Sequence, residues 1–292
     1  MSSRARPESS GPPDLYYNEE EAKKYARNSH IIGIQAQMSE RALELLAVMV
    51  RAGASLYCLL LSGCGTGMSS EVFTEQGHAW IGVDVSLNML KIAKEDENDN
   101  EDGSMGDFIW KDMGTGMPFR PGTFDGAISI SAIQWLCHAN AADQNPRKRL
   151  HRFFQSLYAC LGTGTRAVFQ FYPENEKQTD LIMSQATKAG FHGGLVVDFP
   201  ESTRARKVYL VLMTGGVQQL PKALTQEEDV PRSAQVDNLE RRTFVVSHRD
   251  KNKKPLKHSK AWIQQKRDRL EKQGKTLRQN SKYSGRKRKI RF

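Results

Sequence analysis

The amino-acid sequence predicts an α/β fold, in which a doubly wound, mostly parallel sheet of seven strands carries a basic C-terminal tail. Apolar segments alternate with helical segments between residues 54 and 214, and such alternation builds a parallel sheet covered on both faces. A glycine-rich loop follows the first apolar segment, and the charge changes sharply after residue 240. Because ligands of such sheets bind beyond the carboxyl ends of the strands, functional residues are expected there.

Residues 1–53 predict a loose arm followed by two lid helices. The arm is rich in Pro and Ser, and the first helix is expected over about 18–29. Ser39 is the expected N-cap of the second helix, because its hydroxyl can accept a backbone hydrogen bond. The apolar face of that helix comprises Ala42, Leu43, Leu46 and Val50. Gly53 is expected to end it.

Residues 54–214 predict one domain of strands and helices. The expected strands are 56–61, 79–85, 107–110, 124–131, 165–172, about 194–198 and 207–213. The expected helices are about 66–76, 87–94 after the cap Ser86, 146–161 and 176–189, and the acidic stretch 95–106 is expected to be a loop. The first strand is apolar throughout, as in strands buried on both faces. The last two strands are close enough in sequence to pair antiparallel at an edge.

The net charge of +10 conceals two regions of opposite sign. Residues 241–292 contain 20 Lys or Arg and 3 Asp or Glu, a net charge of +17, which leaves a net charge of −7 on the first 240 residues. We expect a linker over 215–246 and a basic tail over 247–292. Such a tail favours a polyanionic partner, RNA above all, over the alternative of a merely solvated segment.

The cysteines and the apolar runs exclude several classes of protein. Cys58, Cys64, Cys137 and Cys160 form no CxxC pair, so neither a metal site nor a disulfide framework is expected. No run of about 18 apolar residues exists, so no membrane span is expected either.

The loop after the first strand is the main candidate for binding a cofactor. It reads Gly63-Cys64-Gly65-Thr66-Gly67, and its glycines allow a tight turn against which a ligand can lie. Asp84 and Val85 end the second strand, where a carboxylate can accept hydrogen bonds from both hydroxyls of a ribose.

Two kinds of adenosine cofactor fit such a loop. A dinucleotide fingerprint requires Gly or Ala at position 68, and Met68 stands there. S-adenosylmethionine (SAM) has no pyrophosphate to accommodate, so the pattern favours SAM. Asp112 can accept a hydrogen bond from the adenine amino group, and Met113 can pack on the ring. Simple core packing is the alternative for Met113.

Several segments together resemble the eukaryotic 18S ribosomal RNA guanine-N7 methyltransferases, a family of class I, Rossmann-like SAM methyltransferases. They are YYNEEEAKKYARNS, GCGTG, GVDVS, DMGTGMPFRPGTFDGAISISAIQWL, YPEN, QATKAGFHGG, SKAWIQQKRDRLEKQG and YSGRKRKIRF. The match covers most of the chain, and the tail is its most discriminating part. One position departs from the family pattern. Two residues before the first loop glycine, the family has an acidic residue that receives the cofactor's amino group, and here that residue is Leu61.

The resemblance implies SAM as cofactor and a role in small-subunit ribosome biogenesis. It implies a small zinc-binding activator protein as partner, added to the sheet as a strand. It also implies an N-terminal lid in which Tyr16, Tyr17, Tyr25 and Arg27 cover the cofactor; plain helix-surface residues are the alternative for these four. It further implies the nucleus as location, in the nucleolus or nucleoplasm, with the cytoplasm as a further site. The run from Arg286 to Lys289 agrees with nuclear targeting.

Guanine N7 carries a lone pair and no proton, so its methylation needs alignment and exclusion of water rather than a general base. Trp135 is the candidate to stack on the target guanine, and Gln134 is the candidate to contact a base edge. Core packing is the alternative for Trp135, and a core thiol is the interpretation of nearby Cys137. Two other functions stay open: a non-catalytic ribosome assembly factor, and another RNA or small-molecule methyltransferase.

Overall fold

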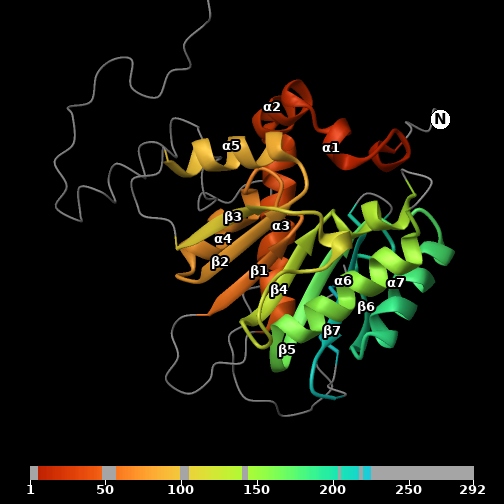
Figure 1. Cartoon of the computed structure of the whole chain (residues 1–292). Coiled ribbons are helices and arrows are strands. Elements are labelled where there is room, and N and C mark those ends of the chain that lie inside the picture. The colour runs from red at the N-terminus through yellow and green to blue at the C-terminus, as the bar shows by residue number, and fades with distance from the viewer. Residues whose placement is uncertain are drawn as a thin grey trace, which may run out of the picture. The chain divides into compact units, whose positions relative to one another are not determined.

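A computed structural model describes residues 6–47, 57–98, 105–139, 144–202, 205–216 and 220–224. Seven strands form one sheet in the order β3-β2-β1-β4-β5-β7-β6. The strand order reverses between β1 and β4, which is the switch point beside which ligands bind in folds of this kind. The mostly parallel, doubly wound sheet predicted from the sequence is therefore confirmed (Figure 1).

The strands occur where apolar segments were expected. They are β1 (Cys58–Ser62), β2 (Ala79–Asp84), β3 (Gly106–Trp110), β4 (Phe124–Ile130), β5 (Leu161–Phe171), β6 (His192–Asp198) and β7 (Lys207–Met213). β1 to β5 pair in parallel, whereas β7 runs antiparallel between β5 and β6. The predicted antiparallel pair at the sheet edge is thus confirmed.

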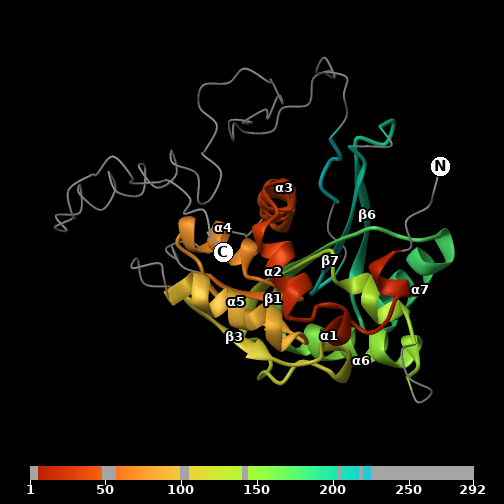
Figure 2. The same cartoon turned by 90° about the horizontal axis from the view of Figure 1, so that it is seen from above.

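Helices cover both faces of the sheet. On one face lie α3 (Ser29–Leu46), α4 (Met68–Glu75) and α5 (Leu87–Asn98), and on the other lie α6 (Pro146–Cys160) and α7 (Glu176–Lys188). Successive strand residues alternate between two buried clusters: Phe169 packs with α6 and α7, and Val168 packs with α3. Figure 2 shows α3 and α4 on the opposite side of the sheet from α6 and α7.

The N-terminal segment differs from the expectation in two respects. The arm expected to be loose contains the short helix α1 (Pro13–Tyr16). α2 (Glu19–Arg27) is present, but α3 begins at Ser29 rather than after Ser39. Asn28 is the N-cap, and its side-chain oxygen accepts from the amides of His30 and Ile31 at 3.1 and 3.3 Å. Asn caps a helix as well as Ser does. Ser39 lies inside the helix, and its hydroxyl donates to the carbonyl of Gln35.

Other boundaries shift by a few residues. α5 continues to Asn98, into the stretch expected to be a loop, and β5 begins at Leu161, four residues early. The expected face residue Val50 and the expected stop Gly53 lie outside the described residues.

The chain after β7 returns to the sheet. The amide of Leu224 donates to the carboxylate of Asp198 at 2.8 Å, and Arg41 of α3 donates to the carbonyl of Lys222. The rest of the predicted linker and the whole predicted tail lie outside the described residues. Within the described ranges, none of the helices combines the length and apolar character needed to cross a membrane.

Candidate cofactor and base site

The glycine-rich loop has a backbone that only glycine adopts readily. Gly63, Gly65 and Gly67 have φ angles of +71°, +56° and +76°, in the region that costs other residues energy. A Cβ on Gly63 would lie 2.2 Å from the Cβ of Ala132, the residue before the turn that carries Gln134 and Trp135. The loop therefore lies directly against the turn after β4.

Asp84 links the glycine loop to the end of β2. One carboxylate oxygen accepts from the amide of Gly65 and the other from the amide of Ser86, each at 2.8 Å. Each oxygen keeps a further lone pair, so the carboxylate can still accept from two hydroxyls. Burial raises the pKa of Asp84, while the backbone amides of Ser86, Gly65 and Val85 lower it. The position thus suits a ribose.

The start of the loop shows what replaces the missing acid. Leu61 is 2% exposed and packs in the apolar cluster on the α3 side. Beside it, the hydroxyl oxygens of Ser62 and Thr66 are buried and have no hydrogen-bond partner within the described residues. Buried polar groups are normally paired. The apolar Leu61 thus supplies no carboxylate at the start of the loop, where two buried hydroxyls are left unpaired among the described residues.

Asp112 has a partner that the sequence analysis missed. One nitrogen, Nη2 of Arg149, donates to both carboxylate oxygens of Asp112 at 3.0 and 2.9 Å, and the amide of Gly114 donates to Oδ1. Oδ1 therefore has no free lone pair, and Oδ2 retains one. An adenine amino group could donate only to Oδ2. No sequence signal connects Arg149 with a residue 37 positions away.

The other two residues expected at the adenosine are placed as follows. The carbonyl of Val85 accepts from the indole nitrogen of Trp110 at 2.9 Å, so its backbone is fixed at the end of β2. Met113 is half-buried and packs against the apolar cluster of α6. This contact agrees with core packing. Packing of Met113 on an adenine ring stays a prediction.

Aromatic side chains of the N-terminal arm lie on Trp135. The rings of Tyr16 and Tyr17 lie 5.9 and 5.8 Å from its ring, and Tyr17 lies 5.9 Å from Tyr25. Trp135 is only 7% exposed as a result. Burial raises the pKa of Tyr25 to about 12, and Asp84 adds to the rise. The arm thus lies over the carboxyl ends of β2 and β4, as a lid would.

Polar contacts hold this arm at both ends. The guanidinium of Arg6 donates to the carbonyl of Tyr172 at 2.8 Å, just beyond β5. The carbonyl of Tyr17 accepts from the side chains of Ser86 and Asn88, each at 3.2 Å. In Figure 1 the short helix α1 (Pro13–Tyr16) accordingly lies above the carboxyl ends of the strands.

A second polar group missed by the sequence analysis lies next to Gln134. Gln134 donates to the carbonyl of Ser131 at 3.0 Å, and the hydroxyl of Ser131 donates to Oε1 of Gln170 at 2.8 Å. Ser131 has a φ of +56°, a strained backbone that is common at functional sites. Oε1 of Gln134 and Nε2 of Gln170 are buried without a partner among the described residues. One acceptor and one donor are therefore left unpaired on the two glutamines that bond to Ser131.

Cys137 is half-buried against the apolar cluster of α6, and burial raises its pKa to about 12. This supports the interpretation of a core thiol. Within the described ranges, no group of three or more His, Cys, Asp or Glu side chains could hold a metal ion.

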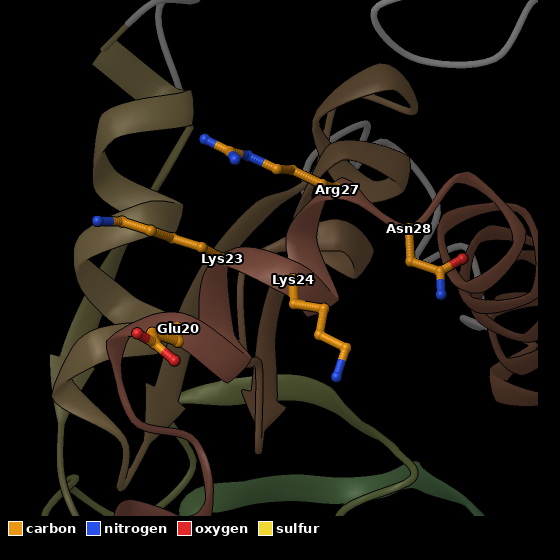
Figure 3. A pocket seen from close by; sticks show the side chains of 5 residues that line it. All are labelled: Glu20, Lys23, Lys24, Arg27 and Asn28. Carbon is orange, nitrogen blue, oxygen red and sulfur yellow. The ribbon is translucent and has the colours of Figure 1, made fainter. Parts of the chain in front are cut away.

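The outer side of α2 carries a hollow that is separate from this site. It has a volume of about 560 Å³ and is lined by Glu20, Lys23, Lys24, Arg27 and Asn28. In Figure 3, Lys23 and Arg27 extend to the same side of the helix. Lys23 and Lys24 pair with glutamates of their own helix. Because none of its lining residues belongs to the glycine loop or the strand ends, we do not assign the cofactor to this hollow.

Comparisons with known proteins agree with this geometry. The family model "Methyltransferase domain" matches residues 60–169, and "Methyltransferase involved in Williams-Beuren syndrome" matches residues 212–290. Magnesium protoporphyrin IX methyltransferase from Synechocystis, solved with bound SAM, is 14% identical, with a TM-score of 0.50 over 73% of this chain and 100% of that one. That structure shows the shared fold.

Full-length relatives are much more similar. The 18S rRNA (guanine-N7)-methyltransferase of Mus musculus is 48% identical over 297 residues, with 100% of both chains covered. The probable enzyme of that name from Dictyostelium discoideum is 46% identical, covering 99% of this chain and 100% of its own. The 18S rRNA (guanine(1575)-N7)-methyltransferase of Saccharomyces cerevisiae is 42% identical with the same coverage. The chain therefore belongs to the family of 18S rRNA (guanine-N7)-methyltransferases.

Proposed function

We propose that this protein transfers a methyl group from SAM to N7 of a guanine in 18S rRNA. The observation that carries the proposal is the meeting of the glycine loop with the turn after β4, at Gly63 and Ala132. This contact joins the loop expected to hold SAM to the turn expected to hold the base. The chain also resembles, over its full length, relatives that bear the name of this activity.

The protein's part in this reaction is to align the reactants and to exclude water. SAM supplies a methyl group on a positively charged sulfur. Asp84 and the glycine loop hold the adenosine, and Trp135 offers a ring on which a guanine can stack, typically worth ~1–3 kcal/mol. Tyr16 and Tyr17 occupy the surroundings of that ring, so they must move to admit the base or become part of the stack. No proton has to be removed from N7, so no base is needed.

Gln134 and Gln170 read the guanine. Oε1 of Gln134 can accept from the exocyclic amine of the base, and Nε2 of Gln170 can donate to O6. Each of these two unpaired side-chain atoms would then have a hydrogen-bond partner. A site that hydrogen-bonds a substrate group discriminates strongly against an analogue without it.

Inosine in place of the target guanine tests this assignment, because inosine lacks the exocyclic amine. The wild-type chain should methylate inosine more slowly than guanine, whereas Gln134→Leu should treat both alike. Gln134→Glu, which keeps an acceptor oxygen, should retain the preference. A wild-type enzyme that methylates inosine and guanine equally well would contradict the assignment.

The activity itself is tested by mapping N7-methylguanosine in 18S rRNA after depletion of the protein and re-expression of wild type or Asp84→Ala. The methyl group should return with wild type and not with the variant, which lacks the proposed ribose contacts. Leu61 leaves a second function open, a non-catalytic assembly factor. Small-subunit maturation restored by Asp84→Ala without methylation would assign the assembly role separately, and near-normal methylation by Asp84→Ala would contradict the proposed cofactor site.

The expected zinc-binding activator docks along β3 by strand addition. Among the described strands, β3 pairs on one side only, with β2. Two large apolar side chains are exposed there, Trp110 at 65% and Met105 at 41%. A strand edge that no other described strand pairs with, and that carries apolar side chains, is a template for another chain.

The protein acts in the nucleus, in the nucleolus or nucleoplasm, with the cytoplasm as a further location. The support is the basic run Arg286 to Lys289 and the ribosomal RNA named as substrate of the relatives. A fluorescent fusion of the full chain, compared with one in which these four residues are glutamines, tests this; equal nuclear signal would contradict a targeting role for the run.

A further inference from the structure

We infer that the catalytic unit has its own binding surface for the RNA phosphate backbone, on the amino-terminal half of α6. This α6 basic surface consists of Lys111, Arg147, Lys148 and Arg152. The inference deepens the proposed function, because it concerns how the RNA substrate is held beside the site. It adds a contact that is distinct from the basic tail.

The α6 basic surface lies at the same edge of the sheet as the glycine loop. α6 leads directly into the start of β5, so its first turn must lie near the carboxyl ends of the strands. Arg149, within this turn, contacts Asp112 at 2.9 Å. The amide of Lys111 donates to the carbonyl of Asp84 at 2.8 Å. The basic side chains therefore begin one residue from the proposed adenosine site.

A hollow of about 470 Å³ separates α6 from the loop that follows β3. Its lining residues are Lys111, Thr115, Gly116, Met117, Pro118, Arg152, Gln155, Ser156 and Ala159. Lys111 contributes from the loop and Arg152 from the helix, so both components of the hollow carry a cation. Arg147 and Lys148 are exposed on the preceding turn. The surface can thus receive several phosphates of an extended strand.

No described carboxylate forms an ion pair with the α6 basic surface. From Gln144 to Cys160 the sequence has four Arg or Lys and no Asp or Glu. Arg149 pairs with Asp112, whereas the other three and Lys111 form no ion pair with any described residue. The first 240 residues carry a net charge of −7, so such a concentration of positive charge is unusual in this unit.

The placement of these cations opposes the local physics of a helix. Cations in a first turn face the positive end of the helix dipole. Lys148 and Arg152 are four residues apart, a spacing at which like charges repel. Features that violate local rules are expected at functional sites. Phosphates bound along the surface would remove both repulsions, which a merely solvated helix face would retain.

The test compares two double variants of the full chain that lose the same charge. Lys148→Gln with Arg152→Gln removes half of the α6 basic surface. Lys188→Gln with Lys222→Gln is the control, because both residues are exposed and neither lines this hollow. Lys188 ends α7, and the carbonyl of Lys222 accepts from Arg41 of α3. The dissociation constant for a labelled single-stranded RNA of about 20 nucleotides is measured over a range of salt concentrations.

Each phosphate contact contributes about 0.7 to the slope of log affinity against log salt for single strands. Loss of two contacts should lower this slope by about 1.4 and weaken binding roughly 25-fold at about 0.1 M salt. The control should keep the wild-type slope. Equal effects in both variants, or no effect in the first, would overturn the inference. SAM binding, measured separately by calorimetry, reports on the proposed function, because RNA binding needs no methyl donor.

Discussion

Gly63, the first glycine of the loop after β1, is the position where one added methyl group should disturb the site most. Its φ is +71°, and a Cβ there would lie 2.2 Å from the Cβ of Ala132. Ala132 precedes the turn that carries Gln134 and Trp135. Gly63→Ala should therefore destabilise the glycine loop and displace the base-binding turn together.

Two costs add in this variant. A side chain in left-handed backbone costs ~1–2 kcal/mol. Carbon atoms normally approach to about 3.5–4 Å, so the loop and the turn must separate by more than 1 Å, and overpacking of this kind costs ~1–3 kcal/mol. Gly65 provides a matched control, because its φ is +56° and a Cβ there meets no atom within 4 Å. Gly65→Ala should show the first cost alone.

Urea unfolding of the full chain without cofactor measures both variants. Gly63→Ala should lose ~1–3 kcal/mol more free energy of unfolding than Gly65→Ala, the overpacking cost. Ala132→Gly removes the opposing methyl group and, in a double-mutant cycle, should restore that surplus. If Gly63→Ala and Gly65→Ala lose the same free energy, or if Ala132→Gly gives no rescue, the contact between loop and turn does not exist as described.

Three further predictions concern the surroundings of the site. Arg149→Met should raise the dissociation constant of SAM measured by calorimetry, because Asp112 loses its only ion-pair partner among the described residues. Arg149→Lys should retain most affinity for SAM, since one nitrogen of Arg149 makes both contacts. Equal affinities for the two variants would contradict this role of Arg149. Trp110→Asp should reduce the yield of activator complex on gel filtration after co-expression by placing a charge on the exposed edge of β3, and an unchanged yield would place the partner elsewhere. Cys137, whose pKa burial raises to about 12, should remain a thiol at about pH 8 and react with iodoacetamide far more slowly than a free cysteine; rapid alkylation seen by mass spectrometry would show that the region opens readily.

The α/β alternation and the loop motif could be predicted from the sequence because both depend on neighbouring residues. Unbroken apolar runs such as 56–61 identify strands buried on both faces, and a glycine motif after such a run identifies the turn. The start of α3 could not be fixed in the same way, because Asn28 and Ser39 are both good caps. Ser39 is instead buried and contacts Ser69 at 2.8 Å, a contact that no local pattern reveals.

The partners of the predicted site residues depend on contacts between distant segments. Asp112 was predicted as an adenine acceptor, but the crossing of α6 brings Arg149 onto it and leaves one lone pair free. Trp135 was predicted as a stacking platform, and the N-terminal arm covers it with Tyr16 and Tyr17. The structure therefore limits adenine to one oxygen of Asp112 and requires Tyr16 and Tyr17 to move or join the stack on Trp135. Whether the two residues have these roles stays a prediction.

The sequence by itself determined the order of strands and helices, the glycine loop, and the family through its motifs, because each is a property of residues adjacent in the chain. Only the tertiary structure decided which acceptors are still free, which buried polar atoms lack partners, and that the cations of α6 lie beside the carboxyl edge of the sheet. These features depend on strand register and helix packing, which bring together residues tens of positions apart. The spacing of neighbouring residues in the sequence does not predict such contacts.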